Sequence, residues 1–157
     1  MNFSRYMKKC NSWMACAYKA DKGTFGVELA KERKELYHYV FYGSAKIGLP
    51  FTSDYRIIEA KEGELINVKE LHNKNIIFDF QEDTSMWGFN SLNEEDWDGK
   101  IVNDTFVASG TSVLVCLDGS PVVNNITLSR YDYDELTDGK TYTIIPNDGV
   151  LALFTKI

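Results

Sequence analysis

Only two histidines, His38 and His72, are available in this sequence for acid–base chemistry or metal binding. His38 lies in the run 36–42 (LYHYVFY), whose aromatic residues favour a β-strand. On a strand, His38 points to the face opposite Tyr37 and Tyr39. His38 is therefore either a base or hydrogen-bond donor in a ligand pocket, or a core histidine with satisfied hydrogen bonds. His72 lies in a polar segment typical of a turn and is predicted to be at the surface.

The three cysteines carry no recognisable catalytic or metal-binding motif. Cys10 and Cys16 are six residues apart, and no Cys or His pair follows them at the spacing of a zinc finger. The sequence also lacks a Gly-x-Ser-x-Gly elbow, a phosphate-binding loop and a His-Glu-x-x-His motif. The odd cysteine count and the absence of an apolar leader predict free thiols in a reducing, cytoplasmic compartment. We expect no metal and no other cofactor.

Large aromatic side chains are the other candidates for ligand contacts. Residues 81–98 (QEDTSMWGFNSLNEEDWD) are acidic yet rich in rings, which predicts a long functional loop between strands. Solvent cannot satisfy such rings, so Trp87 and Phe89 are expected to fold back over one end of the sheet structure. The alternative is that they only plug that end. With an opposing wall from two tyrosines, the predicted ligand-binding residues are His38, Tyr39, Trp87, Phe89 and Tyr142.

Length, composition and charge limit the class of protein. The chain has 157 residues, 44% of them hydrophobic and 25% charged, which is typical of one globular domain. Its formal net charge is −6, whereas proteins that bind duplex nucleic acid usually present a basic face. No apolar run is long enough to span a membrane. We therefore expect neither a nucleic-acid duplex nor a membrane as a partner.

Most of the segments that must position these residues have the sequence pattern of β-strands. Runs at 11–19, 75–80, 101–107, 112–117 and 149–155 are apolar or aromatic and predict β-strands. Asp-Gly pairs at 98–99, 118–119, 138–139 and 148–149 are typical of turns between them. Residues 27–36 are compatible with one short helix as well as with a strand. The pattern indicates an all-β antiparallel barrel or sandwich with at most one short helix.

The segment 112–154 resembles the C-terminal half of a small cupin barrel. Residues 113–120 (VLVCLDGS) resemble the strand and glycine turn that close the first cupin motif, and 139–149 (GKTYTIIPNDG) resemble the second. The layout is similar to the dTDP-sugar isomerase branch of the cupin superfamily, which also has strands ahead of the barrel. The resemblance implies a cupin-like jelly roll over 1–157, with N-terminal strands in 1–64 and a barrel core in about 65–157.

The sequence lacks the residues that the metal chemistry of such barrels requires. Metal-binding cupins use His-x-His and Glu in the first motif and a His in the second, since inward imidazoles and a carboxylate form an open site. With Gly99 as the first motif glycine, the His-x-His positions fall near Thr105 and Val107, and the last histidine position falls at Ala152. A one-residue shift introduces Asp104 and no histidine. The resemblance therefore implies a cupin-like chain without the metal site.

Three functions fit these observations. The leading one is a metal-free, non-catalytic module that binds a small molecule or a protein partner. The second is a structural or assembly protein, for example of a virion. The third is a sugar-nucleotide isomerase or epimerase relative that uses tyrosines and carboxylates with His38. Because jelly-roll sheets present long edges, we also expect a homodimer formed partly by residues 1–45.

Overall fold

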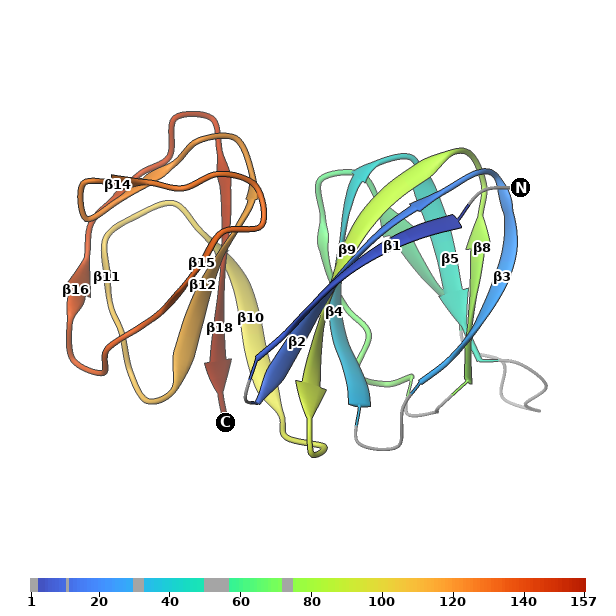
Figure 1. Ribbon diagram of the computed structural model, residues 1–157, viewed down its shortest axis with the longest axis horizontal. Helices are drawn as coiled ribbons and strands as arrows, with labels where there is room; N and C mark the ends of the chain where they lie inside the picture. Colours follow the sequence, from blue (N-terminus) through green and yellow to red (C-terminus); the bar gives the residue numbers. More distant parts are fainter. Residues whose placement is uncertain (1–2, 11, 30–32, 50–56, 72–74) are drawn as a thin grey trace. The chain divides into compact units, whose positions relative to one another are not determined.

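The computed structural model describes residues 3–10, 12–29, 33–49, 57–71 and 75–157. These residues form antiparallel strands and turns, and no helix occurs among them. The chain divides into two compact units, Met1–Glu95 (unit 1) and Asp96–Ile157 (unit 2), which are described separately (Figure 1). Within the described ranges, no apolar helix reaches the length that a membrane crossing requires. His72 lies outside the described residues.

Unit 1 is built from two antiparallel sheets. The first has the strand order β1 (Phe3–Lys9), β2 (Trp13–Ala20), β9 (Thr84–Leu92), β4 (Arg33–Tyr42) and β7 (Leu65–Asn67). The second has the order β3 (Gly23–Glu28), β8 (Asn75–Phe80), β5 (Ser44–Gly48) and β6 (Ile57–Lys61).

Both sheets of unit 1 contribute alternate side chains to one hydrophobic core. The β8 run NIIFDF shows the pattern clearly, since Ile76, Phe78 and Phe80 are buried while the residues between them are more exposed. From the other sheet, Cys16 and Tyr18 of β2 enter the same core. This core is where the polar residues described below are placed.

Unit 2 is a smaller set of antiparallel sheets. Its main sheet has the order β10 (Trp97–Val102), β18 (Val150–Lys156), β12 (Ser112–Asp118) and β15 (Tyr133–Glu135). Short pairings join β11 (Phe106–Val107) to β16 (Thr141–Tyr142), and β13 (Val122–Val123) to β14 (Ile126–Thr127) and β17 (Ile144–Ile145). Its core includes Leu114, Leu151 and Tyr142.

The predicted all-β antiparallel fold is confirmed, and several strands coincide with their predicted ranges. β8 has the bounds expected from sequence, and β12 and β18 differ by about one residue. The alternative of a short helix at 27–36 is wrong, because Val27 and Glu28 belong to β3 and Arg33–Leu36 to β4. The Asp98-Gly99 pair is not a turn, since it lies inside β10. Gly119 and Gly139 do adopt the positive φ expected of Asp-Gly turns, at 73° and 81°.

The predicted acidic loop at 81–98 is also wrong. Its middle forms β9, which is buried along its whole length and pairs with β2 and β4. The acids lie at the two ends of the segment, whereas 84–92 (TSMWGFNSL) carries no charge. The net charge of 81–98 as a whole therefore does not reveal that its middle is an uncharged strand, which a sheet can bury.

We keep the single domain over 1–157 as a prediction, although the boundary between the compact units lies at 95/96 and not near residue 65. Unit 2 is small enough to be marginally stable alone, so both units are expected to unfold together. Trp97→Phe leaves tryptophan probes only in unit 1, and the double variant Trp13→Phe/Trp87→Phe leaves one only in unit 2. Fluorescence and circular dichroism should then give superimposable urea transitions for each variant. Two separate midpoints within one variant would contradict a single domain.

Candidate functional site

A bulge in β4 brings two titratable residues to the same face of the strand. Regular alternation would place Glu35 and His38 on opposite faces, because they are three residues apart. The register between β4 and β9 shifts between Glu35 and Tyr37, so an extra residue resets the alternation. Both side chains therefore enter the interior of unit 1, and each is completely buried. Tyr37 and Tyr39 point to the other face, as alternation predicted for them relative to His38.

Glu35 is the centre of a buried polar cluster. Its Oε2 lies 3.0 Å from Nε2 of His38, a distance typical of an ion pair although the two atoms are not aligned as a hydrogen bond. Its Oε1 accepts a hydrogen bond of 3.2 Å from Nη2 of Arg33. The two carboxylate oxygens thus face two different nitrogen-bearing side chains of the same strand.

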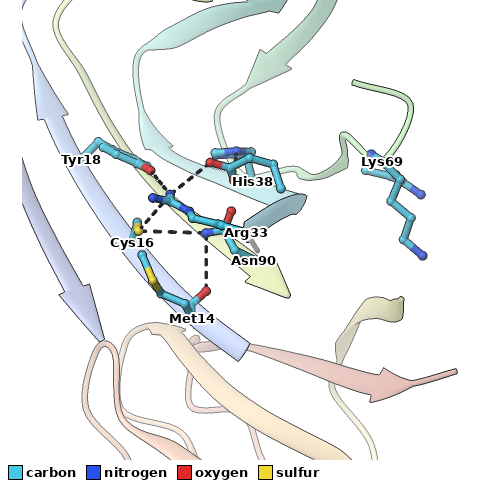
Figure 2. Close-up of polar contacts among 9 residues, drawn as sticks. Met14, Cys16, Tyr18, Arg33, His38, Lys69 and Asn90 are labelled. Carbon is cyan, nitrogen blue, oxygen red and sulfur yellow. Dashed lines mark hydrogen bonds and ion pairs between the residues drawn. The ribbon is translucent and has the colours of Figure 1, made fainter. Parts of the chain in front are cut away.

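Arg33 connects Glu35 to strand β2. Its Nη2 also lies 3.1 Å from the hydroxyl of Tyr18 and 3.2 Å from Sγ of Cys16 (Figure 2). Arg33 is the first residue of β4, and only 7% of its side chain is exposed. The guanidinium therefore enters the core at the end of the strand, with its charge balanced by Glu35.

Asn90 faces Glu35 from the neighbouring strand, since the two residues are Cα partners in the β4–β9 pairing. In one amide orientation Nδ2 lies 3.5 Å from the carbonyl oxygen of Met14 and 4.0 Å from Sγ of Cys16 (Figure 2). In the reversed orientation Nδ2 donates to both oxygens of Glu35, at 3.1 Å from Oε1. An ionised carboxylate only accepts hydrogen bonds, so we assign the reversed orientation.

The electrostatics of the cluster keep Glu35 charged. Burial by itself would raise the pKa of Glu35, but the attraction of His38 and Arg33 outweighs it and holds this pKa below its ordinary value. Burial, followed by repulsion from Glu35, raises the pKa of Tyr18 well above its ordinary value, so its phenol stays protonated. The cluster thus holds an acceptor carboxylate beside a neutral phenol.

Aromatic rings and one glycine hold the imidazole of His38 in place. The ring lies edge-on to Phe78 at a centroid distance of 5.6 Å and over Tyr18 at 6.4 Å. Its Cα partner on β9 is Gly88, where an added Cβ would lie 2.8 Å from Cε1 of the imidazole. Gly88 therefore leaves the space that His38 occupies. Nδ1 of His38 is buried and has no hydrogen-bond partner among the described residues.

The predicted ligand residues separate into three places. His38 is in the interior of unit 1, whereas Tyr39, Trp87 and Phe89 lie on the other face of the same sheet, with Tyr39 and Trp87 as Cα partners. Phe89 stacks on Trp13 at 5.5 Å between ring centroids. Trp87 and Phe89 are in the central strand of this sheet and do not fold back from a loop. Tyr142 belongs to unit 2, where it stacks on Phe106.

Sequence reasoning missed five members of the cluster: Cys16, Tyr18, Arg33, Glu35 and Asn90. Arg33 and Glu35 lie in the segment 27–36, which is compatible with a helix as well as with a strand, and charged side chains are rarely buried. One signal was present. Arg33 and Glu35 are two apart, the spacing of one strand face, directly before the strongest β run of the chain.

These residues do not fit a metal centre of the kind that cupins hold. Thr105, Val107 and Ala152 offer no imidazole in unit 2. Among the described residues, no group of three or more His, Cys, Asp and Glu side chains is placed to hold a metal ion. In unit 1 the guanidinium of Arg33 already lies against the Glu35 carboxylate.

The Cys116 thiol does not fit a nucleophile either. Burial, followed by repulsion from Asp132, raises its pKa to about 11, so the thiol stays protonated at neutral pH.

Comparisons with known proteins identify the fold. No family model matches the sequence, and no curated protein matches it. YhaK from Escherichia coli is similar in structure, with a TM-score of 0.65 and 11% identity over 96% of this chain and 92% of that one. A cupin 2 conserved barrel domain protein from Leptotrichia buccalis has a TM-score of 0.58 and 11% identity over 99% of this chain and 89% of that one. An oxalate decarboxylase variant from Bacillus subtilis has a TM-score of 0.65 and 9% identity over 92% and 69%.

The chain therefore has a cupin-like, all-β jelly-roll fold, as its sequence predicted. At these identities the likeness establishes the fold alone, and the chemistry of the interior depends on this chain's own residues.

The space that Gly88 leaves for His38 can be tested by adding one methyl group. Gly88→Ala should lower the free energy of unfolding by about 1–3 kcal/mol, because the new Cβ overlaps the imidazole in a packed core. Gly26→Ala, in the strand β3 with nothing within 4 Å of its added Cβ, is the matched control and should be neutral or slightly stabilising. Urea unfolding of both variants measures the difference. Equal stability of the two would contradict this role of Gly88.

The lowered pKa of Glu35 predicts a specific loss of stability in acid. The unfolded chain, with a glutamate pKa of about 4.3, binds the proton more readily than the folded chain. The contribution of Glu35 is therefore complete above about pH 5 and is lost as pH falls through the lower pKa of the folded state. Between pH 6 and 3, urea midpoints should fall more steeply for the unmodified protein than for Glu35→Gln. Parallel pH dependences would show that Glu35 does not carry this effect.

Proposed function

We propose that the protein is a metal-independent binding module whose small-molecule ligand contacts His38 inside unit 1. The observation that carries this proposal is Nδ1 of His38, which is buried and without a hydrogen-bond partner among the described residues. Leaving such an atom unpaired costs about 1–3 kcal/mol, so a ligand that pairs with it recovers that cost on binding. The end of β4 at Arg33, the least buried of the charged members, is the side from which we expect the ligand to enter.

The position of Glu35 defines the ligand chemistry. In the neutral imidazole, which is the form that we propose for ligand binding, a carboxylate oxygen 3.0 Å from Nε2 favours the tautomer with its proton on Nε2. Nδ1 then carries the lone pair and accepts a hydrogen bond. The ligand is therefore expected to offer a hydroxyl or amine hydrogen at this point, which a sugar or a sugar nucleotide does.

A second candidate function is acid–base catalysis on a sugar nucleotide. The His38–Glu35 pair favours it, because a carboxylate that orients an imidazole leaves the distal nitrogen available as a base. Tyr18, with its protonated phenol in the same cluster, is the available acid. This candidate differs from simple binding in one readout, the exchange of a carbon-bound hydrogen of the sugar with solvent.

Two substitutions of one residue separate the two nitrogens of His38. Glutamine places an amide N–H near the position of Nε2, so His38→Gln retains a donor to Glu35 and loses the acceptor at Nδ1. Asparagine can turn its amide oxygen to the position of Nδ1 and so retains an acceptor there. We expect dTDP-glucose to bind the unmodified protein in calorimetry, and His38→Gln to weaken this binding at least tenfold. His38→Asn should weaken it less. Thermal unfolding of each variant verifies that the fold is retained.

The outcomes of this experiment are distinct. Equal affinity of His38→Gln and the unmodified protein would place the ligand elsewhere, and no binding of dTDP-glucose or glucose would contradict a binding module of this chemistry. Deuterium uptake at a sugar carbon in D₂O, lost in His38→Gln, would favour the enzyme. The predicted contacts of Tyr39, Trp87, Phe89 and Tyr142 remain proposals, and the same titration on Phe89→Leu tests the aromatic face.

We further propose that the protein forms a homodimer through residues 1–45. The alternative function, a structural or assembly protein, would also require self-association of this kind. Among the described strands, β1 stands at the edge of the first sheet of unit 1 and pairs with β2 alone, so its backbone can pair with a second copy. Light scattering at tens of micromolar should give twice the chain mass of 17.9 kDa. A monomer mass at that concentration would contradict the dimer. The absence of a disulfide among the described cysteines supports a cytoplasmic protein, and the net charge of −6 supports the absence of a nucleic-acid duplex as partner.

A further inference from the structure

Strand β1 is an open sheet edge that lies in a basic segment. It pairs with β2 along its whole length and with no other described strand (Figure 1). The chain as a whole has a net charge of −6, yet residues 1–20 contain no acid and four bases, Arg5, Lys8, Lys9 and Lys19. Like charges placed directly opposite one another destabilise an antiparallel pair. The basic residues of β1 therefore oppose its pairing with a second β1.

The opposite charge lies on β15, at an edge of the main sheet of unit 2. In the part of the chain that the structure describes, β15 pairs with β12 alone, and all three of its residues are exposed. The segment 132–138 (DYDELTD) contains no base and four acids, Asp132, Asp134, Glu135 and Asp138. β15 is thus a short acidic edge.

The other edge strands of the larger sheets carry no comparable charge. β6 and β10 each contain one acid and one base, β3 contains a single acid, and β7 contains neither. Among the described edges of these sheets, β15 is therefore the one whose charge best complements that of β1.

We infer that β1 of one copy pairs with β15 of a second copy, so that a basic edge and an acidic edge join in one intermolecular sheet. The inference rests on the proposed self-association through residues 1–45 and names the surface of the second copy that takes part. Backbone groups of the two edges supply the hydrogen bonds, and the opposite charges select the partner. In a two-fold dimer this contact occurs twice, because β15 of the first copy meets β1 of the second.

Charge reversal on each edge tests this inference. Arg5→Glu/Lys9→Glu reverses the net charge of β1, and Asp134→Lys/Glu135→Lys reverses that of β15. In sedimentation equilibrium at about 20 mM NaCl, where charges are weakly screened, each double variant should self-associate at least tenfold more weakly than the unmodified protein. An equimolar mixture of the two variants should associate again, because each reversed edge then meets a complementary one. Raising NaCl to about 0.5 M should weaken association of the unmodified protein.

A matched control separates the edges from overall charge. Glu64→Lys/Asp104→Lys makes the same change in net charge as the β15 variant, at two exposed residues outside both edges. It should associate as the unmodified protein does. Equal weakening by this control would overturn the inference, since the effect would then come from net charge alone.

The remaining outcomes distinguish this inference from the homodimer itself. Unchanged self-association of Asp134→Lys/Glu135→Lys would overturn the β1–β15 contact and leave the homodimer in place, whereas a monomeric unmodified protein would contradict both. Loss in both variants without recovery in the mixture also counts against complementary pairing. Circular dichroism verifies folding, and Asp134→Asn/Glu135→Gln, which should weaken association as well, replaces the lysine variant if that one is unfolded. None of these readouts depends on dTDP-glucose binding.

Discussion

The buried carboxylate of Glu35 is the constraint on which the interior of unit 1 depends. Taking an ionised group out of water costs several kcal/mol, and only close partners offset that cost. Here Arg33 faces one oxygen, His38 faces the other, and Asn90 lies opposite on the neighbouring strand. Each partner has its own requirement. The guanidinium needs Tyr18 and Cys16, and the imidazole needs the space beside Gly88.

The backbone provides this arrangement through one irregularity. Without the bulge after Glu35, the carboxylate and His38 would lie on opposite faces of β4, and one of them would point away from the core. Because of the bulge, β4 directs two titratable side chains, Glu35 and His38, to the same core-facing side. Phe78 and Tyr18 then fix the ring of His38 by packing, so the imidazole has a defined position relative to Glu35.

A shared fold does not determine what such an interior does. The structures similar to this chain include a cupin barrel protein, at 11% sequence identity, and an oxalate decarboxylase variant, at 9%. A jelly roll supplies two sheets whose inward positions can carry imidazoles, carboxylates or purely apolar residues. In this chain those positions combine an apolar core with one compact polar cluster, and the cluster carries a side-chain cation. The function we propose rests on that cluster, while the fold supplies only its frame.

The sequence by itself determined the strand content, because β-branched and aromatic runs such as 75–80 and 112–117 carry their own local signal. It also determined that His38 and the tyrosines beside it point to opposite faces, since alternation is a local property. Only the tertiary structure decided that 84–92 is a central strand, because burial depends on β2 and β4 as its neighbours. The meeting of Cys16, Arg33, Glu35 and Asn90 follows from pairing between distant segments and from one bulge, and neither leaves a periodic signal in the chain.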